Sequence, residues 1–490
     1  MTDTKRRGIA IFRGASVLFL AQGFVALAQL GYAAFTSRLV EPPEFGAYGV
    51  AMVVVAAMNL VAVGGVGQSV MRVRDGSVAS RRGAVTYAVV AGLLSGAVLF
   101  LTANWWAVLW NVVPATHAIE MLALSTLFAP ILSVYSGIAR ANGVYAKVAV
   151  SLIASSVIAI GCGIYFVSTY RNAAALTSFI ICQQVLQIVF LGAAAKSSAL
   201  PGRVTATMIP DFVFSYKVMV SNLREYMILN LVKIALTRSA GGASALGSWS
   251  RSDVLTSYPF AMVQTSIMQV VYPEFLASAT VRAKARRQWS DMLVLVSWFT
   301  MPAGTYLALT LPGLVPLLFG SNWQETSNII ALAAVAACLQ PSVVLLSSAL
   351  EAIGSFKAVF RTQAVLLLVV SGIAVWVFAT GHLTVAVTSV IAVAVVRHGI
   401  HLTLGARMGL IDVVYVLRSY AIVVACCVTW YTCTYAASIL AVAVTSNPAL
   451  SWSLRILAVC PSVAAVVAVI MLRRSFPPIL IARRYGLKPA

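Results

Sequence analysis

The sequence predicts an all-α integral membrane protein with about fourteen transmembrane helices: two six-helix lobes related as parallel repeats, plus two C-terminal helices. Three observations support this. Of the 490 residues, 61% are hydrophobic and only 10% are charged, whereas soluble domains average roughly 25% charged residues. Uncharged runs such as residues 14–37 and 83–119 reach or exceed the roughly 20 residues of a spanning helix. A short motif also occurs twice, once in each half of the chain.

Charged or turn-rich breaks divide the apolar runs into fourteen predicted helices. In chain order they cover residues 14–38, 47–71, 83–104, 119–139, 148–170, 173–195, 212–237, 244–272, 292–319, 326–350, 362–380, 383–405, 417–440 and 455–472. The first run is longer than the roughly 7–15 apolar residues of a secretory signal, so we expect a retained first span. The predicted organisation is an N-terminal lobe (1–200), a C-terminal lobe (201–410) and a final helix pair with a basic tail (411–490).

The distribution of cations predicts the orientation. The net charge is +21, and 25 of the 34 Lys and Arg fall in alternate segments that are all cytoplasmic if the amino terminus is cytoplasmic. Only four lie at the outer ends and loops. A missed helix would exchange inside and outside from that point onward, yet the alternation continues to the end of the chain. The positive-inside rule therefore predicts that both termini are cytoplasmic and that the outer loops are short.

The repeated motif joins the first and second helices of each lobe. Its first copy contains Arg38 and "FGAY" at residues 45–48; its second contains Arg238 and "LGSW" at residues 246–249. Each copy has a helix, an arginine at its outer end, a turn and a glycine two residues before an aromatic residue. We interpret the glycine as the tight re-entry into the next helix. Six helices separate the copies, which predicts parallel repeats about an axis along the membrane normal. Convergence of short outer loops on glycine and aromatic residues is the alternative.

The stretch "RLVEPPEFGAYGVAMVVVAAMNLVAVGGVGQSVMR" resembles the first helix pair of the lipid-linked oligosaccharide (polysaccharide) flippases of the multidrug/oligosaccharidyl-lipid/polysaccharide exporter superfamily. Residues 230–275, which include Tyr272-Pro273, are similar to helices 7 and 8 of those flippases. The resemblance covers the whole chain and implies fourteen helices and transport rather than enzymatic activity. The family often has Asp-Arg where this sequence has Val232-Lys233, which puts an ion pair there in doubt.

Ionisable residues within predicted spans concentrate in helices 7 and 8. An ionisable group at the centre of a span costs roughly 2.5–3.5 kcal/mol, so such groups face the protein interior or water. We predict that Lys217, Arg224 and Arg251 form a cationic track. The remaining candidate residues are Ser221, on the same helix face as Lys217 and Arg224, the neutral hydrogen-bonding pair Gln22 and Gln29 on helix 1, and Glu225, Lys233 and Asp253 as coupling or ion-pair residues.

Structural roles remain open for several of these residues. Arg224 could form a salt bridge with Asp253, and Glu225 could pair with Lys233 or Arg251. Lys217, Lys233 and Arg251 could extend their charges to the nearest membrane surface. Ser221 could bond to its own helix backbone, and Gln22 and Gln29 could be core residues.

An arginine near the midplane suits a diphosphate, which accepts paired hydrogen bonds, and glutamines suit sugar hydroxyls. The predicted substrate and principal partner is therefore a polyprenyl-diphosphate-linked glycan moved across a bacterial inner membrane, with a polymerase and other polysaccharide-assembly proteins as further partners. A cation-coupled drug antiporter is disfavoured because predicted helices 1, 2, 3, 5 and 6 contain no Asp or Glu. A glycosyltransferase or polymerase is disfavoured by only 13 acidic residues and no long loop. We expect no cofactor, metal or nucleic acid.

Overall fold

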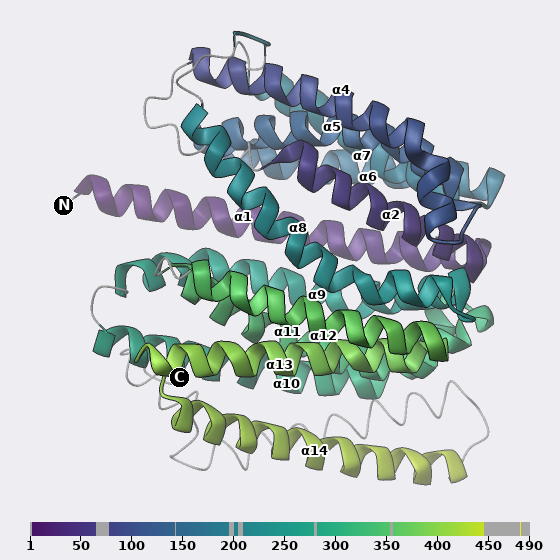
Figure 1. Cartoon of the computed structure of the whole chain (residues 1–490), viewed down its shortest axis with the longest axis vertical. Helices are drawn as coiled ribbons and strands as arrows, with labels where there is room; N and C mark the ends of the chain where they lie inside the picture. Colours follow the sequence, from purple (N-terminus) through teal and green to yellow (C-terminus); the bar gives the residue numbers. More distant parts are fainter. Residues whose placement is uncertain are drawn as a thin grey trace. The chain divides into compact units, whose positions relative to one another are not determined.

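The computed structural model describes residues 2–64, 78–142, 144–195, 200–203, 209–278, 282–352, 356–444 and 481. Over these ranges the chain forms thirteen α-helices and one short 3₁₀ helix, with no strand (Figure 1). Every predicted helix from the first to the thirteenth has its counterpart. The fourteenth, residues 455–472, lies outside the described residues. The predicted all-α membrane fold is confirmed.

The chain divides into two compact units. Unit 1 comprises Met1–Ser250 and Ala374–His382, and unit 2 comprises Arg251–Ile373 and Leu383–Ala490. The division therefore falls inside α9 and again inside α12. The helices up to α9 are α1 (Thr2–Leu39), α2 (Pro42–Val63), α4 (Val78–Leu109), α5 (Ala115–Ala141), α6 (Tyr145–Tyr170), α7 (Ala173–Ala195), α8 (Ile209–Arg238) and α9 (Gly242–Ser278). The later helices are α10 (Arg282–Phe319), η3 (Ser321–Trp323), α11 (Gln324–Ala352), α12 (Phe356–Thr380), α13 (Leu383–Arg407) and α14 (Val413–Val444). The lobe boundaries at residues 200 and 410 stay a prediction.

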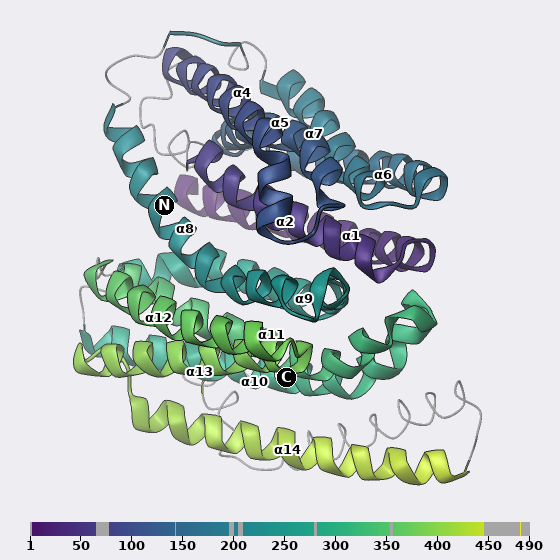
Figure 2. The same ribbon diagram turned by 45° about the vertical axis from the view of Figure 1, so that its right-hand side comes forward.

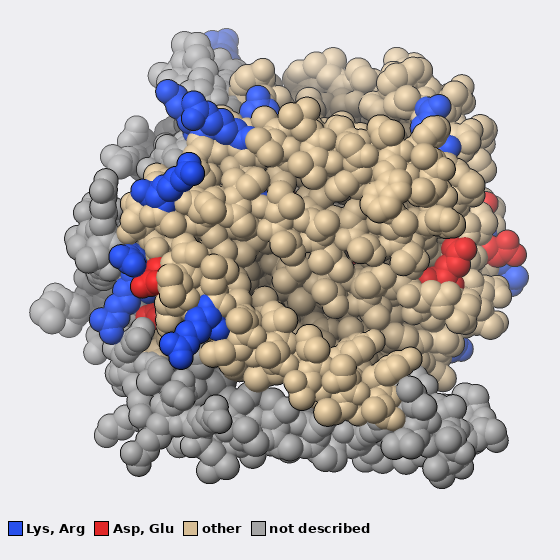
Figure 3. All heavy atoms as spheres, turned by 60° about the horizontal axis from the view of Figure 1, so that its bottom comes forward, with Lys and Arg blue, Asp and Glu red and all other residues tan. Residues whose placement is uncertain are grey.

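Ten helices of the described chain are long and apolar enough to cross a membrane. The other three are α1, α8 and α9, and of these α8 and α9 carry several charged and polar residues in their central parts. On the face shown in Figure 3, Lys and Arg lie toward two opposite edges, with more of them on the left, and the broad area between these edges carries neither cations nor carboxylates. A multi-pass membrane protein needs such an uncharged band, because charged side chains are costly in hydrocarbon.

The start of α2 corrects two sequence interpretations. The helix begins at Pro42, five residues before the predicted start, because prolines in its first two positions fix a helical φ and need no backbone donor there. Gly46 is therefore a buried residue inside a helix and not a re-entry turn. The observed α2 contains Glu44, and the observed α1 contains Asp3. The prediction that the first two helices contain no acidic residue was therefore wrong.

Glu44 has a structural partner. Its Oε2 accepts a 2.7 Å hydrogen bond from the backbone nitrogen of Ala173, the first residue of α7. The first backbone N–H groups of a helix have no partner inside the helix, and the helix dipole favours a carboxylate at this end. Asn172 supports the same helix start by accepting a 2.9 Å bond from the nitrogen of Ala175. The carboxylate at the N-terminal end of α2 therefore fixes the beginning of α7.

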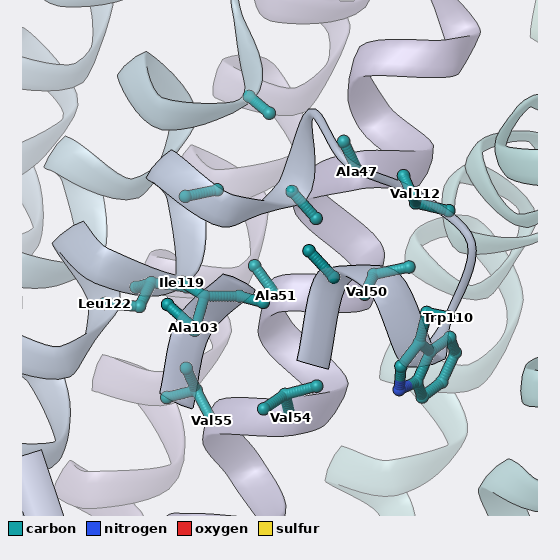
Figure 4. Packing of buried hydrophobic residues seen from close by; sticks show 14 of the residues in the cluster. Ala47, Val50, Ala51, Val54, Val55, Ala103, Trp110, Val112, Ile119 and Leu122 are labelled. Atoms are coloured by element: carbon teal, nitrogen blue, oxygen red, sulfur yellow. The ribbon is translucent and has the colours of Figure 1, made fainter. Parts of the chain in front are cut away.

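The core of unit 1 forms where α2, α4 and α5 meet (Figure 4). Small and β-branched residues of α2, among them Ala47, Val50 and Ala51, face Ala103 of α4 and Ile119 of α5. Helices α4 and α5 lie side by side in Figures 1 and 2. Lipid supplies little hydrophobic force between helices, so close packing of small residues has to hold them together.

The core of unit 2 is built from α10, α11, α13 and α14. Trp289 and Leu293 of α10 pack with Leu345 of α11, Leu402 of α13 and Val416 of α14, all almost completely buried. Two polar bonds join these helices. The Trp298 indole donates to the Ser419 hydroxyl at 2.9 Å, and His398 and Tyr420 share a 3.0 Å hydrogen bond. Polar contacts of this kind contribute because bilayer hydrocarbon offers no alternative partner.

Candidate functional site

Helix α8 carries most of the predicted site residues and is continuous over its whole length. Arg224 lies at its midpoint and is exposed, whereas Glu225 is half-buried. Lys217 and Ser221 belong to the same helix, but their side chains lie outside the described residues. Seven residues separate Lys217 from Arg224 in the sequence, nearly two helical turns, and the expectation that the two share one face of the helix stays a prediction.

Tyr226 anchors this helix to α2. Its hydroxyl donates a 2.7 Å hydrogen bond to the backbone carbonyl of Val53, near the middle of α2. Asn230 donates a 2.9 Å bond to the carbonyl of Tyr226, one turn back along α8. A tyrosine two residues after Arg224 thus fixes the register of the central part of α8 on α2. Sequence reasoning missed Tyr226, because nothing in its local pattern separates it from an ordinary apolar helix position.

The C-terminal half of α8 has two further anchors in unit 1. The ammonium group of Lys233 lies 5.1 Å from the ring centroid of Trp249, a buried residue of α9. Such a cation–π contact is favourable when the ring is shielded from water. Arg238, in the last turn of α8, donates a 2.6 Å bond to the carbonyl of Leu109 at the end of α4. That carbonyl belongs to the last turn of a helix, where backbone acceptors lack partners within the helix. Aromatic and arginine positions of the repeated motif therefore hold α8 in place.

The two glycines of the repeated motif pack at the same helix crossing. A methyl group on Gly46 would collide with the carbonyl oxygen of Ala243 and lie 2.9 Å from the Ala243 Cα. A methyl group on Gly247 would collide with the carbonyl oxygen of Pro42. The two contacts are counterparts at the motif's own offset of 201 residues, since Pro42 corresponds to Ala243 and Gly46 to Gly247. The glycines thus permit the first turns of α2 and α9 to touch, backbone against backbone.

The other predicted residues are placed as follows. Gln22 and Gln29 are both half-buried on α1. Arg251 is 6% exposed and begins unit 2. Asp253, two residues further along the same helix, is half-buried and accepts a 3.2 Å hydrogen bond from the hydroxyl of Ser257. Arg224 and Arg251 belong to different units, so the cationic track that would combine them stays a prediction.

A family model described as "Polysaccharide biosynthesis protein" matches residues 35–328, more than half of the chain. The chain belongs to this family of polysaccharide biosynthesis proteins. Both copies of the repeated motif and the whole of α8 lie within the matched residues. One relative is the lipopolysaccharide biosynthesis protein WzxC of Escherichia coli (strain K12), which is 21% identical to this chain over 330 residues, 66% of its length. The chain spans 65% of the length of that relative.

Solved structures show the same fold in the wider superfamily. The lipid II flippase MurJ in its inward closed conformation has a TM-score of 0.64 and 14% identity, covering 93% of this chain and 100% of MurJ. An inward-facing multidrug resistance MATE family transporter of the MOP superfamily has a TM-score of 0.61 and 14% identity, covering 78% of this chain and 96% of the transporter. At these identities the likeness concerns the fold. It agrees with the resemblance stated from the sequence, which the family match confirms.

Proposed function

We propose that this polysaccharide biosynthesis protein is a flippase that moves a polyprenyl-diphosphate-linked oligosaccharide from the cytoplasmic to the outer leaflet, for surface-glycan synthesis. Membership of the family, the relative named for lipopolysaccharide biosynthesis and the fold likeness to a lipid II flippase support a transport role. In this proposal the protein lies in a bacterial inner membrane with both termini cytoplasmic, performs no catalysis and works beside polysaccharide-assembly proteins such as a polymerase.

The observation that carries the proposal is the exposed position of Arg224 at the midpoint of α8. A guanidinium halfway along a spanning helix is costly in hydrocarbon, so its exposed surface needs water or an anion beside it. A diphosphate offers several acceptor oxygens and negative charge, and a planar guanidinium donates two parallel bonds to such a group. Lys217, on the same side of α8, and Arg251 would extend the positive potential, and Ser221, Gln22 and Gln29 would bond the sugar hydroxyls.

Alternating access of the two predicted lobes would carry the head group while the polyprenyl tail remains in lipid. Glu225, Asp253 and Lys233 would serve coupling or charge balance in this scheme. The drug-antiporter alternative loses further support from Glu44, because this carboxylate caps α7 and thereby has a structural role. The enzymatic alternative still lacks the carboxylate clusters and long loops that such catalysis uses.

Replacement of Arg224 tests the proposal. In cells that depend on this protein for surface polymer, we expect Arg224→Ala to abolish polymer export and Arg224→Lys to retain part of it, because an ammonium keeps the charge but loses the paired bonds. The matched control is Arg361→Ala, an exposed arginine near the start of α12. Membrane levels of all variants are compared by immunoblot. Wild-type polymer yield from Arg224→Ala at normal protein level contradicts the proposal.

A further inference from the structure

A large apolar groove lies within unit 1 and plays no part in the proposed transport site. Its volume is about 1150 Å³, and its walls come from α4, α5, α6 and α7. This volume exceeds the roughly 300–1,000 Å³ of ordinary small-molecule pockets. All of its lining residues belong to one compact unit.

The lining of the groove combines large exposed apolar side chains with small residues. Phe100 and Leu101 of α4 are 56% and 81% exposed, and Met121 of α5 is 50% exposed. Gly96 and Ala97 of α4 also line the groove. A methyl group on Gly96 would stand 3.0 Å from the carbonyl oxygen of the α5 residue opposite, so the two helices are almost in backbone contact there. A groove with such an apolar, exposed lining suits a hydrocarbon chain.

The length of the groove matches one membrane leaflet. Along α5 it extends from His117 to Leu127, which at 1.5 Å per residue is about 15 Å. The hydrocarbon core of a bilayer is about 30 Å thick. The groove therefore reaches from one membrane surface to about the bilayer centre, on the side that the predicted orientation makes the outer leaflet.

The surface end of the groove carries charges of both signs. His117 and Glu120 share a 3.0 Å hydrogen bond there, between Nδ1 and Oε2, and their side chains are 82% and 34% exposed. Arg171, which caps α6 in a left-handed conformation, lies between the lining residues Tyr170 and Asn172 and is exposed. A cation and a carboxylate at the same rim complement a head group that contains both a phosphate and an ammonium.

We propose that this groove binds a phospholipid of the adjacent leaflet that bears an ammonium head group, namely a phosphatidylethanolamine, with an acyl chain along α4 and α5. The phosphate lies toward Arg171 and the ammonium toward Glu120. The geometry favours this occupant over a polyprenyl diphosphate, because a long polyprenyl chain exceeds the length of a groove one leaflet deep and a polyprenyl diphosphate has no ammonium group to meet the Glu120 carboxylate. The site does not depend on the flippase proposal, since it uses none of the α8 residues.

The test counts lipids bound to the purified full-length protein by native mass spectrometry, after incubation with phosphatidylethanolamine or phosphatidylglycerol of equal chain length. Ala97→Trp fills the groove from an exposed position. We expect it to lower bound phosphatidylethanolamine by about fivefold or more, the equivalent of losing at least about one buried methylene. The matched control, Ala364→Trp, places the same side chain at an exposed alanine of α12 and is expected to bind as wild type does.

Two further variants test the groove and the head-group preference separately. Ser178→Phe fills the groove from α7 and serves if Ala97→Trp does not fold. Glu120→Gln should reduce the preference for phosphatidylethanolamine over phosphatidylglycerol by about two- to fivefold, the worth of an exposed ion pair. Equal lipid binding by the groove-filling variants and the α12 control overturns the site, and equal wild-type binding of the two lipids overturns the choice of head group. Either result leaves the Arg224 export experiment unaffected.

Discussion

Gly247 lies so close to Gly46 that a side-chain carbon on Gly247 would stand 3.0 Å from the Gly46 backbone nitrogen. The two residues occupy equivalent places in the repeated motif and come from the first turns of α2 and α9. Both copies of the motif take part in this one contact. Each copy supplies the glycine that admits the other copy's backbone.

This contact predicts that Gly46→Ala is destabilising. The added methyl group collides with the Ala243 carbonyl, and overpacking of this kind costs roughly 1–3 kcal/mol. We expect the purified Gly46→Ala protein to have a lower midpoint of thermal denaturation than the wild type. Size-exclusion chromatography measures the loss of folded protein on heating. The control is Gly372→Ala in α12, where a methyl group meets nothing within 4 Å, so the helix should gain about 0.5–1 kcal/mol. Equal midpoints for the two variants would contradict the close approach.

Loss of the Tyr226 hydroxyl should loosen α8 from α2. Tyr226→Phe removes the 2.7 Å bond and leaves the Val53 carbonyl with one donor fewer, at a cost of about 0.5–1.5 kcal/mol. We expect a lower denaturation midpoint together with faster hydrogen exchange in the middle of α8. Tyr216→Phe on the same helix removes a hydroxyl from a side chain that is 62% exposed and should change neither quantity. Identical behaviour of the two variants would show that Tyr226 does not anchor α8.

The contact between Lys233 and Trp249 predicts energetic coupling. In a double-mutant cycle with Lys233→Met and Trp249→Leu, each single variant should be less stable than the wild type, and the double variant should lose less than the sum. The expected coupling is about 0.5–2 kcal/mol, the range for cation–π pairs from exposed to desolvated sites. Stability is measured by denaturation of the purified variants. Strict additivity would mean that the ammonium gains nothing from the ring.

Two neighbouring glutamates provide an internal comparison of capping. Glu44→Ala removes the acceptor for the Ala173 backbone nitrogen and should cost about 0.5–2 kcal/mol. Glu41 lies three residues earlier, at the N-cap of α2, and makes no side-chain capping bond, so Glu41→Ala should change stability little. Thermal denaturation of both variants measures the difference. If Glu41→Ala proved the more harmful, the assignment of the cap to Glu44 would be wrong.

Most of the fold was predictable because hydrophobic runs and charge alternation report directly on membrane burial. The thirteen described helices follow the predicted order, and the errors concentrate at their ends. The sequence "EPPEFG" was interpreted as a turn because its prolines and glycine are common in loops, yet the prolines begin α2 and the glycine packs inside it. A composition rule does not distinguish a proline that ends a helix from one that starts it.

The candidate site was predictable only in part. The ionisable residues of α8 stand out because charge is rare in spans, and the structure places Arg224 at the centre of that helix. Tyr226 and Glu44 were missed because each bonds to a backbone atom far away in the chain, namely the Val53 carbonyl oxygen and the Ala173 nitrogen. Any residue type presents the same backbone carbonyl or amide, so the sequence holds no complementary side chain that would reveal such a pair.

The polarity of α8 also has a consequence for biogenesis. The ribosome synthesises α2 well before α8, since 173 residues separate Val53 from Tyr226. A segment as polar as α8 partitions poorly into lipid by itself. During synthesis it finds α2 already inserted and presenting the Val53 carbonyl, so the early helices act as a template that retains the later, less lipophilic one.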